Sequence, residues 1–304
     1  MNQFEDIIFI CIKFIKYFQS LSYKFKIRIK IKFFTNTKNT INSKNVQKET
    51  SQMDILSRKE KFMFNFRTDL AAERREIYRT ANKLENEING IESEEQQIDE
   101  NIKVDRVKIT NEEGEKAIGK PKGVYVTIDI KNLKIAGEEE IQKSADTVAD
   151  ELRKIVDSHV DKNGEILVVG LGNIYVTPDA LGPKVINDIE VTRHMIKYLP
   201  QYVKEGARNV SAISPGVLGT TGIETVEILK GIVENTHPKL LIVIDALASR
   251  SIERISSTVQ ISDTGIVPGA GVGNTRKEIS QNTLGIPVVA IGIPTVVDIF
   301  SCNA

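Results

Sequence analysis

The stretch LLIVIDALASRSIER, residues 240–254, carries the clearest information about the fold. It opens with five apolar residues in a row, Leu240 to Ile244, and an acidic residue follows them directly. Short apolar runs of this kind are typical of strands that are buried on both faces of a parallel sheet. Segments of helical length separate this run from three similar ones, so the sequence predicts an α/β fold with a mainly parallel sheet flanked by helices. The other three runs are ILVVG (166–170), VSAIS (210–214) and PVVAI (287–291).

Amphipathic spacing predicts helices between these runs. In residues 138–160, apolar side chains such as Ile141, Val148 and Leu152 recur at helical intervals. Proline is favourable in the first turn of a helix, which places a helix start near Pro183. The expected elements are helices over residues 138–160 and 183–199, a helix that opens with the capping-box spacing of Thr221 and Glu224, a strand over residues 123–130, and a helix followed by a loop over residues 53–120.

The first 52 residues differ in composition from the rest of the chain. They carry ten Lys and Arg against three acidic residues, a net charge of +7, whereas the remaining 252 residues carry −7. The apolar run Ile7 to Ile12 is too short to span a membrane. We interpret residues 1–52 as an extension created by a mis-assigned start codon or as a disordered tail. A targeting or membrane-contacting arm is the alternative.

Thiol, metal and nucleotide chemistry have little support in the sequence. Cys11 and Cys302 lie near the two chain ends, so the body offers no disulfide framework, zinc cluster or cysteine nucleophile, and a reducing, intracellular setting is expected. The three histidines are scattered without ligand spacing. The segments GLGN (170–173) and GAGVGN (269–274) match neither dinucleotide nor P-loop patterns, and nucleotide binding is kept only as an alternative.

Three aspartates lie in the segments that follow two of the apolar runs. Asp245 directly follows the run at 240–244, and Asp179 and Asp263 lie in loops rich in Gly, Pro and Thr. In open parallel sheets, ligands bind beyond the carboxyl ends of the strands. Two neighbouring carboxylates share a proton because the first charge makes the second costly, and such a pair activates water for amide hydrolysis. The alternatives are a helix N-cap for Asp179 and a turn residue for Asp263.

Four long segments carry a resemblance: VVGLGNIYVTPDALGP (168–183), ISPGVLGTTGIET (213–225), IDALASRSIERISSTVQISDTGIVPGAGVGN (244–274) and LGIPVVAIGIPTVVD (284–298). Together they resemble the germination protease family of spore-forming bacteria, over about Phe66 to Asp298. The resemblance implies an atypical aspartic endopeptidase with a fold related to the hydrogenase-maturation peptidases, of the phosphorylase/hydrolase-like kind. It implies a self-processing zymogen that forms a homotetramer in the cytoplasm of the forespore and spore core. The implied substrates are the small acid-soluble proteins that protect spore DNA.

The resemblance assigns roles to individual residues where the motifs match. The catalytic pair that it implies is Asp179, in TPDALGP, and Asp245, in IDALASRSIER. The propeptide bond that it implies is Asp69–Leu70, in RTDLAAE. There an acidic residue precedes a large apolar one, which is similar to the bond cut in the substrates and suits self-processing.

Three further residues are expected to support this pair or to hold substrate: Asp263, Arg250 and Arg254. The two arginines also suit an ion-pair network with Glu253, close to Asp245. No cofactor and no metal is expected, and neither nucleic acid nor membrane is an expected direct partner.

We expect three regions in the chain. Residues 1–52 form the extension, residues 53–69 a propeptide-like segment, and residues 70–304 an α/β peptidase domain. The family pattern continues beyond residue 298, so this domain is expected to be truncated at its C-terminus. Two alternatives follow: a metal-dependent maturation-type peptidase, which needs more ligands than the sequence offers, and a truncated homologue that has lost activity.

Overall fold

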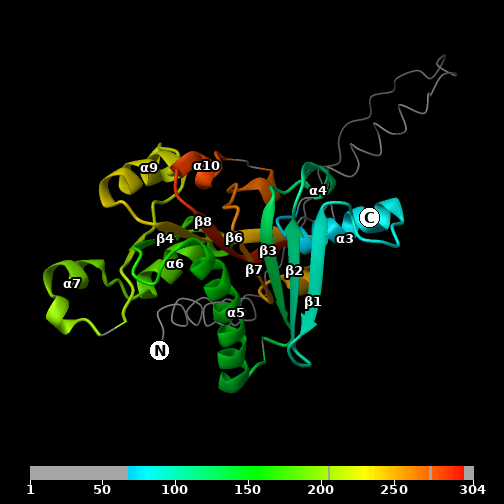
Figure 1. The fold of residues 1–304 in the computed structure, drawn as a ribbon, viewed down its shortest axis with the longest axis horizontal. Helices are drawn as coiled ribbons and strands as arrows, with labels where there is room; N and C mark the ends of the chain where they lie inside the picture. Colours follow the sequence, from blue (N-terminus) through cyan, green and yellow to red (C-terminus); the bar gives the residue numbers. More distant parts are fainter. Residues whose placement is uncertain (1–67, 134, 205, 274–275, 298–304) are drawn as a thin grey trace, which may run out of the picture.

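The computed structural model describes residues 68–133, 135–204, 206–273 and 276–297. The expected extension over residues 1–52 and the expected truncation beyond residue 298 lie outside the described residues, as does nearly all of the propeptide-like segment. Figure 1 shows a sheet through the middle of the molecule with helices packed around it, which confirms the α/β class.

Eight strands form the sheet, in the spatial order β1-β2-β3-β7-β8-β6-β4-β5. The expected strand over residues 123–130 and the one over 166–170 are confirmed with these bounds. The strands are β1 (Ile91–Gln97), β2 (Ile102–Ile109), β3 (Gly123–Ile130), β4 (Ile166–Gly170), β5 (Val210–Ile213), β6 (Leu240–Ser249), β7 (Thr258–Ser262) and β8 (Val288–Val297).

The sheet is mixed, so the prediction of a mainly parallel sheet is wrong for one of its halves. Strands β5, β4, β6 and β8 pair in parallel and are the four that the apolar runs predict. Strands β1, β2, β3 and β7 pair antiparallel, and β7 joins β8 in the same sense. The antiparallel half includes three strands that the sequence does not predict, because charged and polar side chains interrupt their apolar pattern.

The hairpin of β1 and β2 lies in residues 91–109, where the sequence predicts only the loop that follows the first helix. Glu92 lies opposite Lys108 and Glu94 opposite Arg106 in the antiparallel register, with ion pairs of 3.5 and 3.7 Å. Opposite charges directly across two strands stabilise the pair by about 0.2–1 kcal/mol each. Charged side chains on an edge strand also discourage edge-to-edge association. The polar sequence of β1 is therefore suited to a strand at this edge of the sheet.

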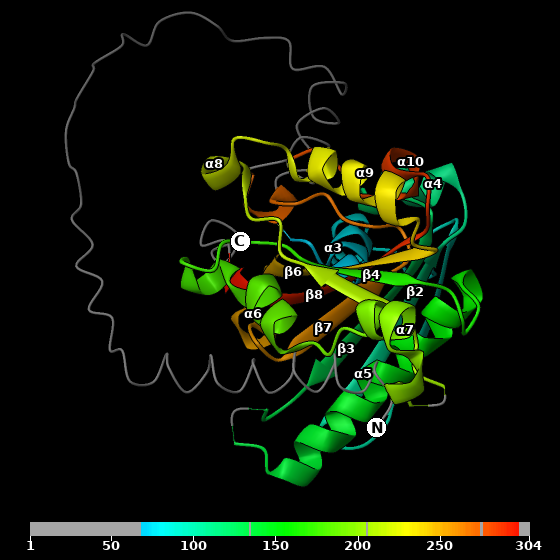
Figure 2. The same ribbon diagram turned by 90° about the vertical axis from the view of Figure 1, so that its left-hand side faces the viewer.

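Both faces of the parallel half are buried. Leu167 and Val169 point toward one cluster of apolar side chains, whereas Ile166 and Val168 point toward another, as the alternation of a strand requires. Figure 2 shows α9 and α10 on one side of this half and α6 on the opposite side.

The helices are α3 (Ala71–Asn82), α4 (Glu112–Ile118), α5 (Glu138–His159), α6 (Leu181–Asp188), α7 (Arg193–Tyr198), α8 (Leu218–Thr221), α9 (Thr225–Thr236) and α10 (Gln281–Leu284), with short 3₁₀ turns η1 (Thr177–Asp179), η2 (Pro200–Tyr202), η3 (Ile252–Arg254) and η4 (Ala270–Val272).

Two helix predictions need correction. The helix expected over residues 183–199 is broken into α6 and α7, because Thr192 pairs with Val210 next to strand β5: each backbone N–H donates to an oxygen of the other residue at 2.9 Å. The capping box expected from Thr221 and Glu224 is absent, since Glu224 is itself the N-cap residue of α9 and makes no side-chain capping bond. The helix over residues 138–160 is confirmed as α5.

Candidate active site

Asp245 lies inside strand β6 and not beyond its end. The apolar run predicts a strand that stops at Ile244, but β6 continues to Ser249. The neighbouring strand β4 ends earlier, because its last residue, Gly170, pairs with Ile244. From Asp245 onward, one edge of β6 is therefore no longer covered by β4. The carboxylate still occupies the position just past a parallel neighbour, where sheets of this kind bind ligands.

The surroundings of Asp245 favour its neutral form. The residue is only 6% exposed, and its Oδ1 accepts a hydrogen bond from the backbone N–H of Ala246 at 2.9 Å. Burial raises the pKa of Asp245 well above its usual value, the N–H of Ala246 opposes this rise, and the charges of Asp179 and Asp69 add to it. A carboxyl group with this environment stays protonated at a pH where ordinary aspartates are ionised.

Asp179 is the last residue of η1, in the loop after β4. Its Oδ2 accepts a hydrogen bond from the backbone N–H of Asn173 at 2.8 Å. The helix that follows has Ala180 as its N-cap, so the N-cap alternative for Asp179 is wrong. Gly172 makes this loop possible: its φ is +115°, and a Cβ there would lie 2.0 Å from the carbonyl oxygen of Asp179. Burial raises the pKa of Asp179, and the N–H of Asn173 opposes the rise.

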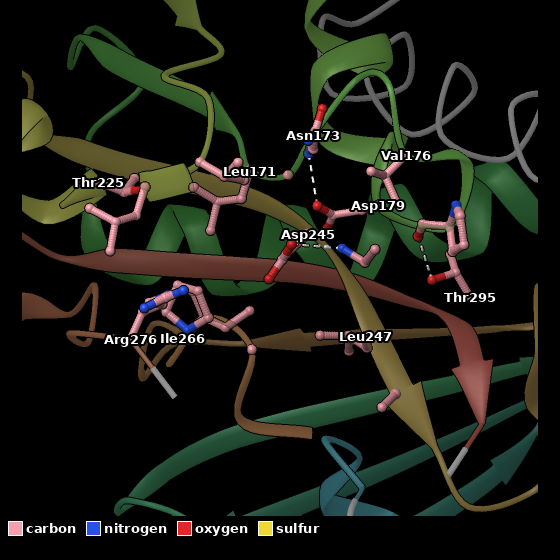
Figure 3. A pocket seen from close by; sticks show the side chains of 18 of the residues that line it. Leu171, Asn173, Val176, Asp179, Thr225, Asp245, Leu247, Ile266, Arg276 and Thr295 are labelled. Carbon is pink, nitrogen blue, oxygen red and sulfur yellow. Dashed lines mark hydrogen bonds between the residues drawn. The ribbon is translucent and has the colours of Figure 1, made fainter. Parts of the chain in front are cut away.

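Asp179 and Asp245 face the same cavity, as Figure 3 shows. The cavity has a volume of about 510 Å³ and lies where the loop after β4 meets the free edge of β6. A hydrogen bond of 2.7 Å from Thr295 Oγ1 to the carbonyl oxygen of Pro178 fastens η1 to strand β8. The fold thus brings together two aspartates that are 66 positions apart in the sequence and raises the pKa of both.

Asp69 is a third acidic residue of this cavity. Its backbone N–H donates to the carbonyl oxygen of Ala248 at 2.9 Å, and the N–H of Ala248 donates to Asp69 Oδ2 at 2.9 Å. The chain around Asp69 therefore lies along the edge of β6 that β4 leaves free. The next residue, Leu70, is completely buried. Of the two residues of the expected propeptide bond, Asp69 therefore lines the cavity that contains both aspartates, whereas Leu70 is packed behind it.

Gln260 of β7 contacts the expected propeptide bond, although it is not among the residues that line the cavity, and the sequence does not reveal it. Its Nε2 donates to the carbonyl oxygen of Asp69 at 3.1 Å, and its Oε1 accepts from the N–H of Ala71 at 2.7 Å. The first goes to the carbonyl of the Asp69–Leu70 peptide bond itself and the second to the N–H of the following peptide unit, so the two hydrogen bonds flank Leu70. A glutamine between Val259 and Ile261 is the signal in the sequence, since it is a polar residue at 7% exposure in an otherwise apolar strand.

Asp263 lies away from the cavity. Its Oδ1 accepts from the backbone N–H of Val124 at 2.8 Å, and His159 Nε2 approaches its other oxygen to 3.8 Å. Asp263 is not among the residues that line the cavity, and its contacts fit the alternative of a structural residue after a strand.

Arg250 and Arg254 also lie outside the cavity lining. The backbone N–H of Arg250 donates to Glu73 at 2.8 Å, and the Arg254 guanidinium lies 3.6 Å from Glu73 and 3.5 Å from Asp129. Arg254 forms an ion-pair network with Glu73 of α3 and Asp129 of β3, rather than with Glu253 as predicted. It fastens α3, which directly follows the Asp69–Leu70 bond, to the turn after β6.

Arg276 supplies the basic side chain of the cavity lining, opposite the carboxylates in Figure 3. Within the described ranges, no group of three or more His, Cys, Asp or Glu side chains is arranged to hold a metal ion. Over the same residues, no helix is both long enough and apolar enough to cross a membrane.

Comparison with known proteins places the chain among the peptidases, the hydrolases of peptide bonds. The model of one peptidase family, described as germination protease, matches residues 68–304. The chain belongs to this germination protease family, as the sequence motifs indicate.

Similar proteins that carry this name agree. The germination protease of Clostridium acetobutylicum is 51% identical over 237 residues, which are 78% of this chain and 72% of the relative. The germination protease of Caldanaerobacter subterraneus is 52% identical over 239 residues, which are 78% and 70% of the two chains. That of Priestia megaterium is 49% identical over 245 residues, which are 79% and 66%.

Proposed function

We propose that this germination protease is an atypical aspartic endopeptidase in which Asp179 and Asp245 form the catalytic pair. The observation that carries the proposal is the meeting of two aspartates of raised pKa and the Asp69–Leu70 bond at one cavity. Asp245 is the more buried carboxyl and holds the shared proton. Asp179 is partly exposed, ionises first and is the base.

The proposed reaction consumes one water molecule. Asp179 takes a proton from this water, whose oxygen attacks the carbonyl carbon of the scissile bond. Gln260 Nε2 stabilises the negative charge that develops on the carbonyl oxygen. Asp245 transfers its proton to the leaving nitrogen, the C–N bond breaks, and a carboxyl group and an amine result. The proton taken up by Asp179 then restores the shared proton of the pair.

We also propose that the chain is made as a zymogen and that its first substrate is its own Asp69–Leu70 bond. The hydrogen bonds of Asp69 to Ala248 and to Gln260 support this, because they hold an extended segment against a free strand edge as a bound peptide would be held. On this view, residues 53–69 are a propeptide and the mature enzyme begins at Leu70. Activity would exclude the alternative of a homologue that has lost catalysis.

The remaining features are proposed from family membership. The substrates are the small acid-soluble proteins that protect spore DNA, and the enzyme acts in the cytoplasm of the forespore and spore core without a nucleic-acid or membrane partner. The enzyme forms a homotetramer. Its parallel half-sheet, with the cavity beyond the end of β4, is the part in which a relation to the hydrogenase-maturation peptidases and the phosphorylase/hydrolase-like folds is expected.

Digestion of a small acid-soluble spore protein tests the proposal. Full chains of the wild type, Asp245→Asn and Asp188→Asn are incubated with this substrate, and the fragments are followed by mass spectrometry. Asp188 is an exposed aspartate at the end of α6 and serves as the matched control. We expect digestion by the wild type and by Asp188→Asn, and none by Asp245→Asn. Digestion by Asp245→Asn at the wild-type rate would remove Asp245 from the mechanism. A metal-dependent reaction predicts, in contrast, that exhaustive chelation stops the wild type.

A further inference from the structure

Glu73 lies in the first turn of α3, close to the leaving nitrogen of the bond that is proposed to be cut. Leu70 is the N-cap residue of this helix, so Glu73 occupies position N3. A glutamate at N3 characteristically reaches back to the N–H of the N-cap residue. Here a threonine lies between the two, because the N–H of Leu70 donates to Thr68 Oγ1 at 3.1 Å and Thr68 Oγ1 donates to Glu73 Oε2.

Glu73 is held by groups that stay in the molecule when the propeptide leaves. It is only 5% exposed, and its carboxylate accepts from the backbone N–H groups of Arg250 at 2.8 Å and Ser251 at 3.2 Å. The Arg254 guanidinium lies 3.6 Å from it. Thr68, in contrast, lies on the propeptide side of the scissile bond and leaves with it. Cleavage therefore removes the one side chain that separates the Glu73 carboxylate from the nitrogen of Leu70.

The cut converts the N–H of Leu70 into an α-amino group, which is mostly protonated at pH 7 because its ordinary pKa is about 7.7–8.0. The position disfavours a cation, since Leu70 is completely buried and lies at the positive end of the dipole of α3. A carboxylate within hydrogen-bond reach offsets both costs. Glu73 is the carboxylate that the fold provides there.

Residues 70–73 also occupy the place that a substrate needs. On the proposed mechanism, the scissile carbonyl of a substrate binds Gln260 Nε2, as the carbonyl of Asp69 does. The residue after the scissile bond then lies where Leu70 lies, and the following N–H takes the acceptor that Ala71 uses at 2.7 Å. Leu70 and Ala71 are both completely buried, so they exclude a substrate from this place while they fill it.

We propose that Glu73 binds the new α-ammonium group of Leu70 and that residues 70–73 of the cut chain compete with protein substrates for the active site. Before the cut, Glu73 is a positioning residue, because its contacts hold the scissile bond beside strand β6. After the cut, the same contacts and the new ion pair keep the first turn of α3 in the site. A substrate binds only to molecules that this segment has left, which lowers the apparent affinity in proportion to their fraction.

This inference rests on the proposed function, because it requires cleavage at Asp69–Leu70. It goes beyond that function by giving the two reactions opposite requirements. Self-cleavage needs residues 70–73 in the site, whereas digestion of another protein needs them out of it. A purely structural role of Glu73 predicts that its substitution impairs both reactions.

Glu73→Gln tests the competition, since glutamine has the same shape but no charge for the ammonium group. Full chains are incubated until the propeptide has been released, and digestion of a small acid-soluble spore protein is then measured. We expect slower propeptide release in Glu73→Gln. For the spore protein, we expect a KM about 10-fold lower at an unchanged kcat, which is the lower end of the effect of a hydrogen bond to a charged group. A KM equal to or above that of the wild type would overturn the competition.

Glu76→Gln is the matched control, because Glu76 is an exposed glutamate of the same helix. It should release the propeptide and digest the spore protein as the wild type does. An equal fall of its KM would assign the effect to the charge of the helix and overturn the role of Glu73.

The reactivity of the new amino group tests the ion pair in the wild type itself. The processed enzyme is treated with an amine-acylating reagent, and mass spectrometry follows acylation of Leu70 beside a free peptide of residues 70–75. We expect Leu70 of the enzyme to react at least about 10-fold more slowly than the peptide. Equal rates would overturn the inference and leave the proposed function standing. A wild type that neither yields a product beginning at Leu70 nor digests the spore protein would overturn the proposed function, and the inference with it.

Discussion

The two halves of the sheet differ in what they contribute to the site. The parallel half, β5-β4-β6-β8, supplies Asp179 and Asp245 from the end of one strand and the free edge of another. The antiparallel half, β1-β2-β3-β7, supplies Gln260, whose side chain contacts the segment that contains Asp69. In the proposed reaction the carboxyl pair therefore belongs to the parallel half, whereas the peptide is held from both halves, by Ala248 of β6 and Gln260 of β7.

On the proposed mechanism, the parallel half supplies the proton-transfer groups and the antiparallel half supplies one of the side chains that hold the peptide. The parallel half is buried on both faces and fixes its carboxylates rigidly. The antiparallel half has a charged edge and presents polar side chains, such as Gln260, to the chain that lies across it. Substitutions in the first half should abolish the reaction, whereas substitutions in the second should slow it or change its selectivity.

The largest expected effect comes from the carboxyl pair. Asp179→Asn and Asp245→Asn should each slow release of the propeptide by about 10²- to 10⁴-fold, the range for a lost general acid or base. The double variant should be no slower than the slower single variant, because the two groups act as one unit. The rate is measured by following the full chain on denaturing gels. Losses that multiply in the double variant would show that the two carboxyls act separately.

The next effect tests the other half of the sheet. Gln260→Glu keeps an acceptor for the N–H of Ala71 but removes the donor to the carbonyl oxygen of Asp69. We expect propeptide release to slow by about 10²- to 10³-fold, as for the loss of one oxyanion donor. Thermal unfolding shows whether the variant is folded, and Gln201→Glu, at an exposed glutamine of η2, is the control. A wild-type rate in Gln260→Glu would confine catalysis to the parallel half.

The sequence predicts the parallel half well, and the reason is physical. Strands such as β4 are buried on both faces, so nearly every residue is apolar and the run is visible without any knowledge of neighbours. The strands of the hairpin are stabilised by cross-strand charge pairs, which exist only once the register is known. Local sequence therefore favours other structures for β1 and β2.

The candidate site follows the same pattern: its residues in the parallel half are predicted from the sequence, and its residue in the antiparallel half is not. Asp179 and Asp245 follow apolar runs and belong to motifs that match the family, so the sequence singles out both residues, and both line the cavity. Gln260 contacts Ala71 and Asp69, which are 189 and 191 positions away in the sequence, and no local sequence pattern predicts such contacts. Arg254 is predicted to support the pair because it is close to Asp245 in sequence. Strand β6 is longer than its apolar run, however, so Arg254 lies beyond the cavity.

A smaller effect concerns the stability cost of burying Asp245. Its pKa is raised in the folded protein, so the stability it contributes is fully present below the unfolded pKa and is lost as the pH rises through the folded value. Asparagine does not ionise, so Asp245→Asn does not lose stability in this way as the pH rises. We expect its Tm to exceed that of the wild type at pH 7 by at least about 2 °C, and the difference to vanish near pH 3. A lower Tm than the wild type at pH 7 would contradict the raised pKa.

The smallest effect belongs to the charged edge. Lys108→Glu places like charges opposite one another, at Glu92. Because both groups are exposed, we expect a loss of only about 0.2–1 kcal/mol in the free energy of unfolding, measured in urea. Peptide cleavage should be unchanged. A large loss of cleavage would mean that the hairpin takes part in the reaction and that the division between the halves fails.

The decisive experiment is the intact mass of the full chain after incubation, for the wild type and for Asp245→Asn side by side. We expect the wild type to yield a product that begins at Leu70, and Asp245→Asn to keep its full mass over the same time. The same product from Asp245→Asn at the wild-type rate would contradict cleavage of Asp69–Leu70 by the carboxyl pair.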